Sequence, residues 1–217
     1  MCNIENEKVI TLTEEEMGEC EEGVRKDPSM AKYSSYNKLT GHDKYIHSLL
    51  KYLGVFDLIN DLHILDLGCG SGMVYNELKK EGFRNVSACD INKTFEDVKV
   101  FDFEKRFNYP SDSFDLIICF DVIEHIKDNL HFISEIHRIL KPGGEVIILT
   151  GAAEDFSVFY TSFTHYHPYT KASLNEGLKL FFRASKVEYF KAIPILWRFG
   201  CFINTGLKYN LLGRAIK

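Results

Sequence analysis

The chain has 217 residues, of which 45% are hydrophobic and 26% are charged, so it is long enough to bury the core of one ordinary domain. Its net charge is −5 at pH 7 and no broad basic stretch runs along it, which argues against nucleic acid as a partner. The six cysteines form no CxxC pair, the acidic N-terminus lacks the apolar core of a secretory signal, and no run of about 20 apolar residues could span a membrane, so we expect a cytoplasmic protein.

The first 40 residues are polar and acidic. Between Glu5 and Asp27, nine acidic residues outnumber three basic ones. We interpret residues 1–40 as an N-terminal extension or lid and residues 41–217 as a single domain. From Tyr45 to Phe56, apolar residues recur at helical spacing, which predicts the first helix of that domain.

Beyond this helix, strand-like and helix-like segments alternate along the chain. Strands are predicted at 63–67, 86–90, 98–102, 114–120, 145–150 and 186–191, and helices at 73–81, 126–140 and 174–181. Alternation of this kind predicts an α/β fold: a Rossmann-like, doubly wound, mostly parallel sheet of seven strands, or six, with helices on both faces. Such sheets bind ligands beyond the carboxyl ends of their strands, so the residues that follow the strands are the candidates for a site.

The C-terminal segment, 193–217, is apolar and basic. Between Lys186 and Lys217 there are six basic residues and one acidic residue. The pattern fits a helix as well as a strand, so a seventh strand cannot be located from it. Residues 193–212 could contact a membrane surface, hold a lipid-like acceptor, or pack as a core or dimer helix. The protein is therefore expected to be a monomer or a homodimer.

A glycine turn follows the first predicted strand, in the sequence Asp66-Leu67-Gly68-Cys69-Gly70-Ser71-Gly72. Glycines let the backbone turn tightly and approach a ligand closely. A dinucleotide site requires G-x-G-x-x-G, but the third glycine position holds Met73 or Tyr75, depending on the register. A nicotinamide-dependent oxidoreductase is therefore disfavoured.

The G-x-G-x-G spacing, with a preceding acid, suits a cofactor that has a positively charged amino-acid end. Asp66 can attract an ammonium group, directly or through water. Asp90, at the end of the second strand, can accept hydrogen bonds from two ribose hydroxyls. Asp102, after the third strand, can accept one from an adenine amino group.

These residues resemble the class I S-adenosylmethionine-dependent methyltransferases over about residues 45–190, and within them the type 11 small-molecule group, relatives of the ubiquinone-biosynthesis O-methyltransferases. The resemblance also includes 114–126 and the turn Leu140 to Gly144. It implies S-adenosylmethionine as the cofactor and S-adenosylhomocysteine as the product. It implies a cofactor site with five parts: the glycine turn, the ribose acid, an apolar neighbour that lines the adenine pocket, an adenine-side pair and the end of the fourth strand. In this order, the residues are Asp66, Gly68, Cys69 and Gly70; Asp90; Ile91; Asp102 and Phe103; and Phe120.

The segment Asp121-Val122-Ile123-Glu124-His125 follows the fourth strand, beside the expected position of the methyl group. His125 is our candidate general base for an acceptor that must lose a proton. The ubiquinone-type relatives carry Glu-x-x-Glu-His here, a pattern associated with a divalent metal, and this chain has Asp121 in place of the first Glu. Glu124 and His125 could also simply begin the next helix. We assign no metal ion, and these three interpretations stay open.

The predicted function is methyl transfer from S-adenosylmethionine to a small-molecule acceptor, at oxygen. The loop from Thr164 to Tyr169 either lines the acceptor pocket or is a solvated connection without a chemical role. The alternative from a different class is a non-catalytic S-adenosylmethionine-binding regulatory subunit. An intact acceptor pocket beside 120–125 would favour the enzyme, and a pocket filled by the C-terminal segment or by a partner would favour the binding subunit.

Overall fold

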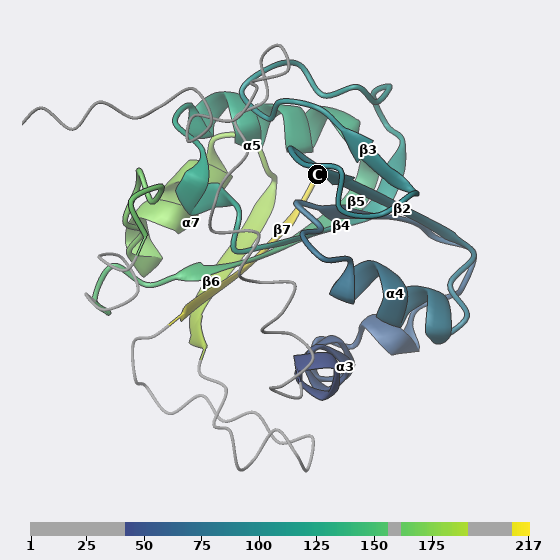
Figure 1. Cartoon of the computed structure of the whole chain (residues 1–217). Coiled ribbons are helices and arrows are strands. Elements are labelled where there is room, and N and C mark those ends of the chain that lie inside the picture. Colours follow the sequence, from purple (N-terminus) through teal and green to yellow (C-terminus); the bar gives the residue numbers. More distant parts are fainter. Residues whose placement is uncertain (1–41, 156–161, 191–209) are drawn as a thin grey trace, which may run out of the picture.

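The computed structural model describes residues 42–155, 162–190 and 210–217, which form one seven-stranded sheet with helices on both faces (Figure 1). The strand order is β3-β2-β1-β4-β5-β7-β6. Neighbouring strands among the first five are parallel, whereas β7 runs antiparallel to both β5 and β6. The predicted fold class is confirmed.

The strands are β1 (His63–Leu67), β2 (Asn85–Asp90), β3 (Val98–Val100), β4 (Phe114–Phe120), β5 (Leu140–Gly151), β6 (Ala184–Phe190) and β7 (Asn210–Ile216). The helices are α3 (His42–Tyr52), α4 (Met73–Lys80), α5 (Asn129–Ile139) and α7 (Lys171–Lys179), with short 3-10 turns η1 (Val55–Asp57) and η2 (Ile123–His125).

Two hydrophobic cores lie on the two faces of the sheet. Helices α3 and α4 cover one face, and α5 and α7 cover the other (Figure 1). Successive residues of a strand point to opposite faces, so Ile64 enters the core under α3 and α4 while Leu65 enters the core under α5 and α7. Burial on both faces explains why β1 and β4 read as nearly continuous apolar runs.

No helix connects β2 to β3 or β3 to β4 within residues 91–113, all of which the structure describes. The second of these connections is instead fastened to α5. The backbone N–H of Phe107 donates to Glu135 Oε2 at 2.7 Å, and the Arg138 guanidinium donates to the carbonyl oxygens of Phe107 and Tyr109 at 3.1 and 2.9 Å. Glu135 and Arg138 also form an ion pair with each other at 2.7 Å. The loop that carries Asp102 is therefore hydrogen-bonded to an ion pair on α5.

The seventh strand, which the sequence left unlocated, is β7. It lies between β5 and β6 and is hydrogen-bonded to both, and Arg214 donates to both carboxylate oxygens of Glu145 on β5, at 2.5 and 2.9 Å. Leu211 and Leu212 enter the two opposite cores, so the segment lacks the alternation that marks a strand with one solvent face. The rest of the apolar C-terminal segment and the predicted N-terminal extension lie outside the described residues.

Three predicted boundaries were wrong. The helix expected over 126–140 is α5, which spans only Asn129–Ile139, because Ile126 ends the turn η2 and Leu140 already pairs with Phe114 as the first residue of β5. The glycines expected to precede the fifth strand lie within it, where the β4–β5 register shifts and Gly143 adopts a φ of +80°. Such irregularities bend a strand without ending it. The third strand stops at Val100, so Asp102 lies in the loop beyond it.

Among the described residues, no helix combines the length and the apolar character that crossing a bilayer requires.

Candidate functional site

The glycine turn connects β1 to α4 at the carboxyl end of the sheet. Gly68, Gly70 and Gly72 all have positive φ angles, of 77°, 50° and 80°. A Cβ on Gly68 would lie 2.2 Å from Val122 Cγ2, so glycine is required there both for the backbone conformation and for space. The turn therefore packs directly against the segment that follows β4, which brings the glycine turn and the segment Asp121 to His125 together.

Asp90 links the glycine turn to the segment after β2. Its Oδ2 accepts the N–H of Gly70 at 2.9 Å, and its Oδ1 accepts the N–H of Asn92 at 2.9 Å. Burial raises the pKa of Asp90 above its ordinary value, and these backbone hydrogen bonds oppose the rise. Each carboxylate oxygen has a second acceptor direction, which leaves capacity for hydroxyl donors. Ile91, the predicted apolar wall, is half-buried beside it.

Asp66 is buried at the end of β1 and satisfies the start of α4. Its Oδ2 accepts the backbone N–H of Tyr75 at 3.0 Å, in a helix whose N-cap, Gly72, has no side chain to do so. Burial raises the pKa of Asp66 to about 7; the Tyr75 hydrogen bond opposes this, and the like charge of Asp90 adds to it. Two buried carboxylates at one end of the sheet create a site that a cation would stabilise.

The two residues predicted to lie beside the adenine, Asp102 and Phe103, have different environments in the structure. Asp102 lies at the surface, where its Oδ1 accepts the N–H of Glu104 at 2.9 Å. The ring of Phe103 is buried among Phe101, Phe107 and Phe132, with centroids 5.3 to 6.0 Å away. Phe103 thus contributes its side chain to the core that supports the loop.

The segment after β4 begins with a strained residue. Asp121 has a φ of +54°, a left-handed conformation that is uncommon outside glycine and that tends to occur at functional sites. Its N–H donates to the carbonyl oxygen of Leu149 on β5 at 2.8 Å. Phe120, the predicted cofactor contact, is half-buried immediately before it at the end of β4.

Glu124 is 6% exposed and lies in η2, directly beyond Asp121. Thr150 Oγ1, at the end of β5, donates to Glu124 Oε2 at 2.8 Å. Burial raises the pKa of Glu124 well above its ordinary value, and the charge of Asp121 raises it further. This carboxyl group is therefore able to hold a proton near neutral pH, or to be ionised by a nearby cation.

His125 meets the loop of residues 162–169, which comes from beyond β5. Its Nδ1 lies 2.8 Å from Thr164 Oγ1, and its ring packs edge-on against that of His165 at a centroid distance of 4.7 Å. The N–H of Tyr166 donates to the carbonyl oxygen of Glu124 at 2.8 Å. The loop is thus docked onto η2. The sequence could not pair these segments, because about 40 residues separate them.

Glu124, His125 and His165 form what we call the acceptor-side cluster. One ligand atom from each lies within 4.8 Å of the others, so one carboxylate and two imidazoles could hold a divalent ion of the zinc or iron type. Asp121, which the sequence placed in the metal set, is not part of this group, and His165 takes its place. A second such group, His47, Glu77 and Glu81, lies between α3 and α4.

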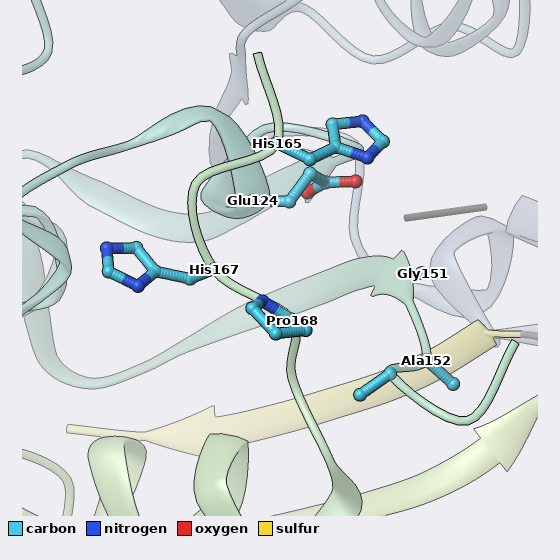
Figure 2. Close-up of a pocket in the computed structure, with 7 residues that line it drawn as sticks. Glu124, Gly151, Ala152, His165, His167 and Pro168 are labelled. Carbon is cyan, nitrogen blue, oxygen red and sulfur yellow. The ribbon is translucent and has the colours of Figure 1, made fainter. Parts of the chain in front are cut away.

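A small pocket adjoins this cluster. Figure 2 shows Glu124 and His165 side by side, with His167 and Pro168 farther along the same loop and the end of β5 opposite. The enclosed space admits about one water-sized sphere. The lining residues come from η2, the end of β5 and the loop: Glu124, Gly151, Ala152, Ala153, His165, His167 and Pro168.

A sequence model described as a methyltransferase domain matches residues 38–199. The chain belongs to this methyltransferase family. It is 36% identical over 104 residues to a ubiquinone biosynthesis O-methyltransferase of Rickettsia conorii, a match that covers 42% of this chain and 36% of that protein. The chain spans less than half the length of the curated relatives it matches.

Solved methyltransferases share the fold. An S-adenosylmethionine-dependent methyltransferase from Archaeoglobus fulgidus superposes with a TM-score of 0.66 at 20% identity, over 86% of this chain and 99% of that one. The plantazolicin methyltransferase BpumL, solved in complex with S-adenosylhomocysteine, superposes with a TM-score of 0.63 at 14% identity, over 88% and 91%. Together with the family match, this confirms the predicted class I methyltransferase fold.

The residues of this methyltransferase fit the cofactor of its class. S-Adenosylmethionine carries an ammonium group, which suits the buried carboxylate of Asp66, and two ribose hydroxyls, which suit the buried carboxylate of Asp90. The Nδ2 of Asn92 is buried beside Asp90 and has no hydrogen-bond partner among the described residues, and a buried donor of this kind calls for an acceptor such as a ribose oxygen. The glycine turn supplies backbone that can lie close to a ligand.

Proposed function

We propose that this protein transfers the methyl group of S-adenosylmethionine to a hydroxyl oxygen of a small molecule, with His125 as the general base. The observation that carries the proposal is the position of His125. It follows the end of β4, its ring is held by Thr164, and the neighbouring Val122 contacts the glycine turn. The base and the residue that contacts the glycine turn therefore belong to one short segment, Val122 to His125.

The cofactor side of the site is proposed to consist of the residues named from the sequence: Asp66, Gly68, Cys69, Gly70, Asp90, Ile91, Asp102, Phe103 and Phe120. S-Adenosylmethionine supplies a methyl group on a positively charged sulfur, which leaves readily. The chain has to hold the acceptor oxygen in line with that group and to remove its proton. Positioning alone can supply much of the rate, since it makes a bimolecular step effectively unimolecular.

The acceptor is proposed to be a phenol-like hydroxyl. Phenols such as the tyrosine side chain have a pKa of about 10, within reach of an imidazole base that is ordinarily near 6.5, and such a base contributes roughly 10²- to 10⁴-fold. The O-methyltransferase activity in the printed name of the Rickettsia relative supports transfer to oxygen. A divalent ion in the acceptor-side cluster is the competing way to favour the ionised hydroxyl.

The alternative is a non-catalytic binding subunit. The pocket between η2, β5 and the 162–169 loop supports the enzyme, because it leaves a space of about one water-sized sphere beside Glu124 and His165, which adjoin His125. The described part of the C-terminal segment, 210–216, lies in the sheet as β7 and does not fill that pocket.

Two measurements test the proposal. Titration calorimetry should show binding of S-adenosylmethionine and S-adenosylhomocysteine, and none of NAD as the control. Transfer of a labelled methyl group to catechol should then proceed with the wild-type protein. His125→Ala should slow it at least about 100-fold with little change in cofactor affinity. Cofactor binding together with equal turnover of the variant would remove His125 from the mechanism. Failure of both ligands to bind would end the enzyme assignment.

A further inference from the structure

A second group of potential metal ligands lies away from the methyl-transfer site, between α3 and α4, which run beside each other in Figure 1. Its members are His47 from α3, Glu77 from α4 and Glu81, the residue at the C-cap of α4. We call them the α3–α4 cluster. The glycine turn adjoins the opposite end of α4, at the N-cap Gly72, so the length of the helix separates this cluster from the proposed cofactor site.

The helices bring the three side chains of the α3–α4 cluster together. Glu77 and Glu81 are four residues apart, so they share one face of the helical turn. That face meets α3, where His47 Nδ1 lies 2.6 Å from Glu77 Oε1 and 3.5 Å from Glu81 Oε1. One ligand atom from each of the three residues lies within 4.8 Å of the others.

These separations suit a tetrahedral ion. With bonds of about 2.0–2.2 Å, neighbouring ligand atoms of a tetrahedral zinc site lie roughly 3.3–3.6 Å apart. The distance between His47 and Glu81 already has this value. The distance between His47 and Glu77 reaches it when the two hydrogen-bonded atoms move apart by about 1 Å, which a change of side-chain torsion supplies without a shift of either helix.

The local charges favour a cation in this place. The side chain of Glu77 is only 9% exposed, and Lys80 Nζ contacts its Oε1 at 3.2 Å from a side chain that is 69% exposed. A solvated partner of this kind contributes little to the stability of an ion pair. Carboxylates at positions i and i+4 also repel each other, and the C-terminal end of a helix attracts positive charge.

We propose that His47, Glu77 and Glu81 bind a divalent ion of the zinc type, which fastens α3 to α4. An imidazole ligand selects such an ion over Mg²⁺ and Ca²⁺, which prefer oxygen. Three protein ligands leave a fourth position for water. Leu50 of α3 and Leu78 of α4 already share one core, so the ion stabilises a contact that exists without it. Its removal lowers the stability of the fold and leaves methyl transfer intact.

Titration calorimetry with Zn²⁺ is the deciding experiment, on the full chain after dialysis against EDTA and then metal-free buffer. The wild type should bind Zn²⁺, and His47→Gln should bind it at least about tenfold more weakly, because even the loss of a group that only orients a ligand costs 10- to 100-fold. His165→Gln, which alters the acceptor-side cluster, should keep this affinity. Equal affinity in His47→Gln, or loss of the binding in His165→Gln alone, would overturn the inference.

Lys80 offers a test in the opposite direction. Zn²⁺ has to displace its ammonium group from Glu77, at a cost comparable to that of breaking an exposed ion pair. Lys80→Gln should therefore tighten Zn²⁺ binding roughly two- to fivefold. Weaker binding by this variant would count against a site at Glu77.

Thermal unfolding provides the second readout. Zn²⁺ at about 100 times its Kd should raise the melting temperature of the wild type by roughly 5–10 °C, and Mg²⁺ at the same concentration should not. Glu81→Gln, at the rim of the cluster, should lose this rise even if His47→Gln does not fold. Glu176→Gln, which removes an exposed carboxylate of α7, is the matched control and should keep it. The same rise in Glu81→Gln, or an equal rise with Mg²⁺, would overturn the inference.

Discussion

Asp66→Asn replaces the buried carboxylate at the end of β1 with an amide of the same shape. The amide oxygen can still accept the N–H of Tyr75, so the start of α4 keeps its hydrogen bond. The variant lacks the free-energy cost of ionising a buried acid. In the wild type this acid, Asp66, has a pKa of about 7 in the folded protein, against an ordinary value of 3.8. That difference corresponds to about 4 kcal/mol between the two protonation states.

The sign of the effect follows from the raised pKa. The folded state binds this proton more tightly than the unfolded state does. The associated stability is therefore fully present below pH 3.8 and is lost as pH rises through about 7. Without cofactor, Asp66→Asn should match the wild type near pH 4. By pH 8 it should exceed the wild type in free energy of unfolding by as much as about 4 kcal/mol.

Urea unfolding followed by circular dichroism at pH 5, 6, 7 and 8 measures this difference. Asp115→Asn is the control. Partial burial raises the pKa of Asp115, but hydrogen bonds from Lys141 and from the backbone of His63 lower it overall. The change in free energy of unfolding caused by Asp115→Asn should therefore be constant from pH 5 to 8. If the curves of wild type and Asp66→Asn stay parallel from pH 5 to 8, Asp66 is not the buried acid described. The same variant should bind S-adenosylmethionine at least about tenfold more weakly, because an ammonium partner is lost.

Three further predictions concern the same site. Asp90→Ala should weaken S-adenosylmethionine binding more than about tenfold by calorimetry, since a hydrogen bond to a charged group contributes roughly 1.5–3 kcal/mol; equal affinity in the folded variant would refute the ribose assignment. Gly68→Ala should abolish cofactor binding or lower the melting temperature much more than Gly143→Ala. Both positions have φ near +80°, but only a Cβ at Gly68 meets Val122, so similar melting temperatures would contradict the packing described. Dialysis against EDTA should leave methyl transfer unchanged if His125 is the base, whereas loss of turnover that Zn²⁺ or Mg²⁺ restores would assign the acceptor-side cluster to a metal.

The parts of this methyltransferase that the sequence predicted are those with a local cause. The boundaries of β1 and β4 agree with the prediction, because strands buried on both faces require uninterrupted apolar residues. The glycine turn was recognisable because tight backbone with positive φ admits little but glycine. Asp90 could be placed from the sequence because it ends a strand whose boundaries are visible there.

Other features were decided only by the tertiary structure. β7 became a strand because β5 and β6 bind it on both edges, a cause that no pattern within seven residues can display. His165 and Thr164 reached His125 because the loop after β5 folds back onto η2, and the ring of Phe103 went into the core because α5 offers it an aromatic surface. Local sequence determines backbone conformation and burial, whereas contacts between distant segments depend on register and loop closure, which exist only once the sheet has formed.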